Sequence, residues 1–122
     1  MTGSRDLAIA AARAASEKQA DDILVLDVRD LIFITDYFVV VSGRSDRQVK
    51  TIAESVEEAL RAEGEKPLRR EGRRDGRWIL LDYVDFVVHV FLEEEREFYG
   101  LERLWADAPS VDWNRAAASS GR

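Results

Sequence analysis

The 122-residue sequence contains no cysteine, and this absence excludes several kinds of chemistry at once. Without cysteine there can be no disulfide, no thiolate nucleophile and no cysteine-ligated zinc or iron–sulfur site. Long hydrophobic runs are also missing, because no stretch approaches the ~18 apolar residues that a membrane-spanning helix needs. Residues 1–13 show no apolar stretch after a basic start, so we expect no secretory signal peptide. These absences predict a cytoplasmic protein.

Histidine is scarce, with a single copy at position 89. His89 lies in the apolar run DFVVHVF, where it shares a strand face with Val87 and Phe91. A histidine among strand hydrophobics is more often a packed, hydrogen-bonded side chain than a catalyst. The nearest carboxylates, Asp85 and Glu93, are each four residues away, a span of about 13 Å in a strand. We therefore expect a structural histidine and no metal site.

Positive charge is also in short supply, since the formal net charge is −6. Proteins that hold nucleic acid mainly through phosphates are usually basic, so general nucleic-acid binding is disfavoured. The charge is unevenly distributed. Residues 66–77 carry six positive and two negative side chains, and residues 93–97 carry four glutamates and one arginine. Such runs are commonly solvated faces, although they could also orient a partner of mixed charge.

Hydrophobic patterning predicts an α+β fold, a single mixed sheet of about five strands with helices packed on it. The expected helices cover residues 4–19, 46–63 and 93–105, and the expected strands cover 23–28, 38–41, 67–70, 77–83 and 85–91. Ser45, with a glutamine three residues later, is expected to cap the second helix, and Gly64 to end it. The last two strands are expected to form a hairpin that turns at Tyr83 and Val84.

Apolar content of 46% is enough for one globular domain with a real core. Residues 1–113 are predicted to form that domain, and residues 114–122, which offer nothing large to bury, a disordered tail. The strand at 67–70 is expected at a sheet edge, where Pro67 is tolerated. Because open edges pair, a homodimer is a further expectation. The third helix is expected to bury an apolar stripe formed by Phe98, Leu101, Leu104 and Trp105.

No assembled catalytic set is recognisable in the sequence. Serines flank Gly43, but the glycine pattern of a hydrolase elbow is absent, as are a Walker-type loop and a dinucleotide turn. A nucleotidyl-transferring site would need two acids one residue apart on a strand to share magnesium, and no predicted strand has such a pair. Asp82 and Asp85 bracket a turn, where aspartates are favoured because they bond their own backbone. The sequence therefore predicts no enzyme and no cofactor.

Trp78, Leu80 and Asp82 alternate onto one face of their predicted strand. Three helices do not guarantee cover for both faces of the sheet. An uncovered Trp78–Leu80 pair would form a compact apolar patch, and a tryptophan buried in a partner's pocket can contribute roughly 2–4 kcal/mol. The alternative is that Trp78 belongs to the core, and the residues alone leave both open.

Four segments of the sequence form a recognisable pattern: DILVLDV (22–28), TDYFVVVSGRSDRQV (35–49), EGRRDGRWILLDYVDFVVHVF (71–91) and EEEREFYGLERLW (93–105). Their content, order and spacing resemble the Iojap-related family, the bacterial ribosomal silencing factors. The resemblance covers about residues 5–113. Thr35, where many members have alanine, is a mild departure.

The resemblance implies a fold similar to nucleotidyltransferases without their catalytic acids. It also implies a translational repressor that binds ribosomal protein uL14 on the intersubunit face of the large subunit and sterically blocks joining of the small subunit. The residues expected to grip that partner are Trp78, Leu80, Asp82, Tyr83, Asp85, Pro67 and Lys66. We add the hypothesis that nearby ribosomal RNA is contacted by Arg69, Arg70, Arg73, Arg74 and Arg77.

Two alternatives stay open. One is a divergent nucleotidyltransferase-type enzyme with a site at Asp27, Asp36 and Asp46. The other is a factor in ribosome biogenesis or a subunit of another assembly.

Overall fold

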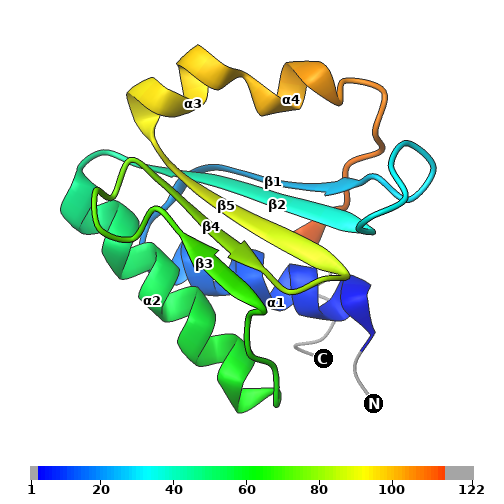
Figure 1. Ribbon diagram of the computed structural model, residues 1–122, viewed down its shortest axis with the longest axis horizontal. Helices are drawn as coiled ribbons and strands as arrows, with labels where there is room; N and C mark the ends of the chain where they lie inside the picture. The colour runs from blue at the N-terminus through cyan, green and yellow to red at the C-terminus, as the bar shows by residue number, and fades with distance from the viewer. Residues whose placement is uncertain (1–2, 115–122) are drawn as a thin grey trace.

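A five-stranded sheet lies between two helical layers in the computed structural model, which describes residues 3–114 (Figure 1). Its spatial order is β1-β2-β5-β4-β3. β2 and β5 pair in parallel, and the other neighbours pair antiparallel. This confirms the predicted mixed sheet. The strands are β1 (Asp21–Asp27), β2 (Tyr37–Gly43), β3 (Arg69–Glu71), β4 (Trp78–Asp82) and β5 (Phe86–Leu92).

Helices α1 (Ser4–Glu17) and α2 (Asp46–Ala62) cover one face of the sheet (Figure 1). The larger core lies between them and the strands, and Val39, Ile52 and Leu81 are fully buried in it. α2 begins with the expected cap. Ser45 Oγ accepts from the Gln48 N–H at 3.1 Å, and Gln48 Oε1 accepts from the Arg44 N–H at 2.7 Å. The two bonds satisfy N–H groups at the start of the helix.

The opposite face is covered by α3 (Glu93–Tyr99) and α4 (Leu101–Leu104) (Figure 1). The prediction of one helix over 93–105 is wrong, because Gly100 takes a left-handed conformation with φ 56° and ends α3. A side chain at this position would collide with the Arg103 guanidinium. The break brings Leu101 and Trp105 onto a second, smaller core. It leaves Phe98 and Leu104 exposed, so of the predicted apolar stripe two residues are partly buried and two are not buried.

Cover on this second face is complete over β2 and incomplete over β4. Every residue of β2 is buried, as its unbroken apolar run predicts. On β4, Ile79 and Leu81 are buried toward the first core, whereas Trp78, Leu80 and Asp82 are only partly buried on the second face. β4 therefore has surface on this face to offer a partner.

The two edges of the sheet differ. The outer edge of β1 is covered by the segment after α4, where the Val111 N–H donates to the Val25 carbonyl and the Asp27 N–H to the Pro109 carbonyl, each at 2.8 Å. At the other edge, β3 is three residues long, and all three are exposed. The predicted edge is confirmed, but the strand begins at Arg69 and Pro67 lies outside it.

The hairpin of β4 and β5 forms with its turn one residue later than predicted. The Tyr83 N–H donates to the Phe86 carbonyl at 3.0 Å, which makes Val84 and Asp85 the turn residues. Most of the predicted tail, residues 115–122, lies outside the described residues. Among the residues that the structure describes, no helix combines the length and apolar character needed to cross a membrane.

Candidate functional site

The partly open surface of β4 is extended by the edge strand β3. In the antiparallel register, Arg69 stands opposite Asp82 and Glu71 opposite Leu80, so these side chains share one face. We call Arg69, Glu71, Trp78, Leu80 and Asp82 the β4 face. It combines two apolar residues with a polar border.

Trp78 is held on this face by ring contacts and one hydrogen bond. Its Nε1–H donates to His89 Nδ1 at 3.1 Å. Its ring stacks on Phe91 with centroids 4.7 Å apart, and Tyr99 from α3 lies at 4.8 Å. Trp78 is partly buried. The indole is thus neither sealed in the core nor freely projecting, and it keeps some surface open to solvent.

His89 is buried with 5% of its surface exposed, and the prediction of a packed, hydrogen-bonded histidine is confirmed. Burial lowers the pKa of His89 to about 4, so the ring is neutral at pH 7. Because Nδ1 accepts the indole N–H, the imidazole proton is assigned to Nε2. Within residues 3–114, Nε2 has no hydrogen-bond partner.

At the hairpin tip, Asp82 bonds the backbone of the turn, as expected for an aspartate at this position. Asp82 Oδ1 accepts from the Val84 N–H at 2.8 Å, and Asp82 Oδ2 accepts from Arg69 at 3.1 Å. Val84 has φ 74°, an unusual conformation for a β-branched residue, and its side chain is exposed. Asp85 is exposed beside it. Asp82 thus shapes the turn and borders Leu80 at the same time.

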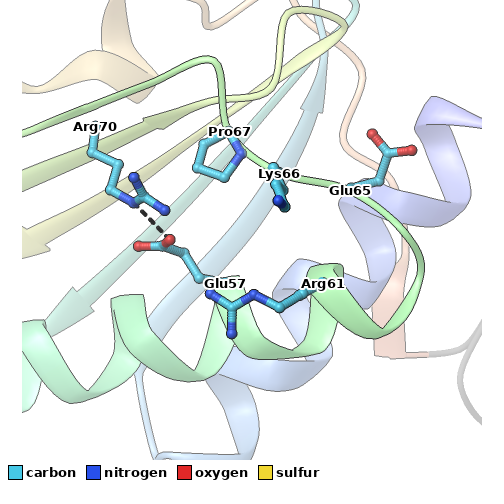
Figure 2. Close-up of a pocket in the computed structure, with 6 residues that line it drawn as sticks. All are labelled: Glu57, Arg61, Glu65, Lys66, Pro67 and Arg70. Carbon is cyan, nitrogen blue, oxygen red and sulfur yellow. Dashed lines mark hydrogen bonds and ion pairs between the residues drawn. The ribbon is translucent and has the colours of Figure 1, made fainter.

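Tyr83, Lys66 and Pro67 do not join the β4 face. Tyr83 is buried on the opposite side of the sheet, stacks on Phe86 with centroids 4.8 Å apart, and has its pKa raised by that burial. Lys66 and Pro67 belong to the loop between α2 and β3 and line a cavity of about 210 Å³ on the α2 side (Figure 2). Figure 2 shows Arg70 reaching from β3 toward α2, where its Nε lies 2.7 Å from Glu57 Oε1.

Four of the five arginines predicted to touch RNA form ion pairs within the chain. Apart from Arg70–Glu57, whose carboxylate is buried, these pairs are exposed, and exposed pairs contribute little to stability, so a stronger ligand could displace them. Within residues 3–114, Arg74 has no carboxylate partner. The pairs offset the positive charge that the sequence suggested. They are Arg69–Asp82 (3.1 Å), Arg70–Glu57 (2.7 Å), Arg73–Glu54 (3.8 Å) and Arg77–Glu95 (2.8 Å).

The acids of the enzyme alternative are not brought together. Asp27 and Asp36 lie near the start of β2, and Asp46 follows its far end, a separation of roughly 20 Å along a seven-residue strand. The Asp27 carboxylate is bonded to Arg29, which lowers the pKa of that carboxyl. In the part of the chain that the structure describes, no group of three histidine or carboxylate side chains could hold a metal ion.

Two aromatic residues that the sequence did not assign to the site border it. Tyr99 contacts Trp78, and Phe98 contacts Tyr99 edge-on with centroids 5.0 Å apart. Phe98 is 78% exposed and Tyr99 47% exposed. The signal that could have revealed them is Gly100, because a helix that ends there separates Phe98 and Tyr99 from Leu101 and Trp105, so that the four no longer form one buried stripe.

The whole sequence is similar to one family of known proteins. A family model described as "Ribosomal silencing factor during starvation" matches residues 2–122. The chain belongs to the ribosomal silencing factor family. The resemblance seen in its motifs is thereby confirmed.

Individual relatives are similar over most of this chain. One from Bacillus subtilis is 44% identical over 102 residues, which cover 84% of this chain and 86% of the relative. The chloroplastic Iojap protein of Zea mays is 37% identical over 108 residues, 86% of this chain and 46% of that protein. A crystal structure from Chromobacterium violaceum is 34% identical with a TM-score of 0.84, covering 86% of this chain and 88% of the other.

Proposed function

We propose that this protein represses translation by docking on the large ribosomal subunit and occupying space that the small subunit requires. The proposed contact on that subunit is ribosomal protein uL14. Family membership supports the general role, since the relatives are named ribosomal silencing factors. The observation that carries the docking site is Trp78, held in one orientation on a surface that the helices leave partly open.

Trp78 and Leu80 are the proposed apolar anchors. The indole is fixed by a hydrogen bond and by two ring contacts, so little side-chain freedom is lost when a partner covers it. A well-packed tryptophan anchor is worth roughly 2–4 kcal/mol at an interface. Asp82 and Asp85 would set the polar border, and Tyr83 would act indirectly by packing the hairpin from below.

Charge favours a basic partner. The chain carries a net charge of −6, and glutamates crowd α3 beside Trp78. Opposite charge on a partner increases the rate of encounter and fixes orientation more than it adds affinity. RNA contact by the arginine-rich loop remains a hypothesis, and Arg74 is its best candidate because the described residues offer it no carboxylate partner.

Steric blocking requires no turnover. One bound protein would inactivate one large subunit, so inhibition should titrate with a one-to-one stoichiometry and need no cofactor. A homodimer that pairs through the exposed β3 edge would lie next to the β4 face and compete with docking. Sedimentation velocity at two protein concentrations detects the dimer, and the same measurement with large subunits present tests the competition.

A subunit-joining assay tests the proposal. Purified subunits are mixed with increasing amounts of protein, and the joined fraction is measured on a density gradient. Trp78→Ala should keep its circular dichroism spectrum, lose co-sedimentation with the large subunit and permit joining. Phe33→Ala is the matched control, because Phe33 is a fully exposed aromatic outside the β4 face. A folded Trp78→Ala protein that still blocks joining would contradict the assignment.

A further inference from the structure

We infer that His89 is a positioning residue, which holds the Trp78 indole in its docking orientation and takes up its N–H, so that Trp78 offers a partner an apolar ring. The inference rests on the proposed function and adds the chemistry of the surface that fits Trp78. It predicts that the partner contacts the indole through apolar atoms and places no hydrogen-bond acceptor against it.

The strand register explains how the two rings meet. Trp78 stands opposite Phe91, and His89 stands opposite Leu80, two pairs further along the ladder and on the same face of the sheet. The indole therefore reaches diagonally across the two strands, a span that aromatic side chains can bridge. The Nε1–Nδ1 distance of 3.1 Å is that of an ordinary hydrogen bond.

The acceptor itself is rigidly held. The His89 ring packs edge-on against Phe38 with centroids 5.0 Å apart, and lies nearly parallel to Phe91 at 6.1 Å. With 5% of its surface exposed, it has little room to change rotamer. A fixed imidazole thus fixes the indole that donates to it, and Phe91 supports the same indole from below.

A histidine at this position would be unfavourable if it served only to fill space. Nε2 has no partner within residues 3–114, and an unpaired buried donor destabilises a fold. A leucine could fill the same space with no polar atom. What the imidazole supplies, and leucine does not, is an acceptor at Nδ1 aimed at Trp78.

The hydrogen bond also decides what Trp78 can present. An indole has one donor and no acceptor, and here the donor points inward. The ring surface that remains accessible consists of carbon and hydrogen. An apolar socket on the partner would match it, whereas a carbonyl facing the ring would lose its bond to water and gain none in return.

Four variants test the inference in the full-length protein. His89→Leu removes the acceptor, and His89→Asn places an amide oxygen near the position of Nδ1. Trp78→Phe keeps a ring without the donor, and the double variant Trp78→Phe/His89→Leu completes a cycle. Each protein is tested for binding to purified large subunits, and the indole N–H signals are followed by ¹⁵N NMR, with Trp78 assigned by the loss of its signal in Trp78→Phe.

His89→Leu should shift the Trp78 N–H signal, speed its hydrogen exchange and weaken binding about two- to tenfold, the range of one hydrogen bond. His89→Asn should restore the signal and most of the affinity. In the Trp78→Phe background, His89→Leu should weaken binding no further. His89→Phe, which fills similar volume without an acceptor, gives the same test if His89→Leu does not fold.

A folded His89→Leu protein that binds like the unmodified protein, while Trp78→Ala does not bind, would overturn the positioning role and leave the docking face intact. Equal weakening by His89→Leu in both backgrounds would also overturn it, because the effect would not pass through the indole N–H. Full binding by Trp78→Ala would instead refute the docking face itself.

Discussion

The face of the sheet under α1 and α2 is sealed and largely aliphatic, whereas the face under α3 and α4 is aromatic, partly polar and incompletely covered. β4 contributes to both. Ile79 and Leu81 point into the sealed core, and Trp78 and Leu80 point to the open side. Alternate side chains leave a strand on opposite faces. Neighbouring residues of β4 therefore serve either the core or the open surface.

The largest effect is expected from a substitution in the sealed core. Leu81→Ala should lower the free energy of unfolding by about 2–5 kcal/mol, because Leu81 is fully buried and its removal leaves a cavity. Leu80→Ala, one residue away on the partly exposed side, should cost less than half as much and reduce binding to the large subunit. Urea unfolding of both variants measures the difference. Equal losses of stability would show that the two faces of β4 do not differ in this way.

Low pH should destabilise the folded protein through His89, which lies beneath the open face. Its pKa is about 4 in the folded protein and 6.5 in the unfolded chain, so below pH 6.5 the unfolded state binds more protons. Stability should therefore fall as the pH drops from 6.5 to 4, by up to about 3 kcal/mol for a shift of this size. The measurement is urea unfolding at several pH values. His89→Leu is the control, and its stability should depend less on pH in this window.

The polar part of the second face can be tested at Arg96, which is 8% exposed. Its Nε donates to Glu102 at 3.1 Å and its guanidinium also donates to Ser42 Oγ at 2.9 Å and to the Asp22 carbonyl. Arg96→Ala should cost about 2–4 kcal/mol, because it leaves these acceptors without their donor. Arg103→Ala, an exposed arginine nearby, should change thermal stability little. A similar loss for both would argue against a role for burial.

The smallest effect is expected at Thr35, which is 5% exposed. Its hydroxyl has no hydrogen-bond partner among residues 3–114. Thr35→Ala should change the free energy of unfolding by less than about 1 kcal/mol and could raise it, because an unpaired buried hydroxyl is removed. Ser42→Ala removes a buried hydroxyl that is bonded to Arg96 and should destabilise the protein. Calorimetry of the pair compares a partnered with an unpartnered hydroxyl.

Local patterns predicted most of the fold. The Ser45 cap and the apolar spacing of α2 are local signals, and both are confirmed. The unbroken apolar run of β2 correctly predicted burial on both faces. The break at Gly100 was missed because the apolar residues on both sides of it continue a helical spacing. A left-handed residue ends a helix whatever the spacing around it.

The site was less predictable because it depends on register and on tertiary neighbours. A two-residue turn at Tyr83 and Val84 would place Trp78 directly opposite His89, whereas the observed turn at Val84 and Asp85 places it opposite Phe91. A shift of one residue in the turn moves the register by two. The carboxylates that pair with the arginines come largely from other elements, such as Glu57 of α2, and no local pattern reveals such a partner.

The parallel pairing of β2 with β5 sets the order in which the protein can fold during its own synthesis. Tyr37 pairs with Phe86, so the chain must pass through α2, β3 and β4 before the central ladder can form. Until residue 92 is available, β1 and β2 can pack only against α1 and α2, because β5, which joins them to β4, is missing. The nascent chain therefore acquires its cooperative structure late, and truncation before β5 should yield an unfolded, aggregation-prone product.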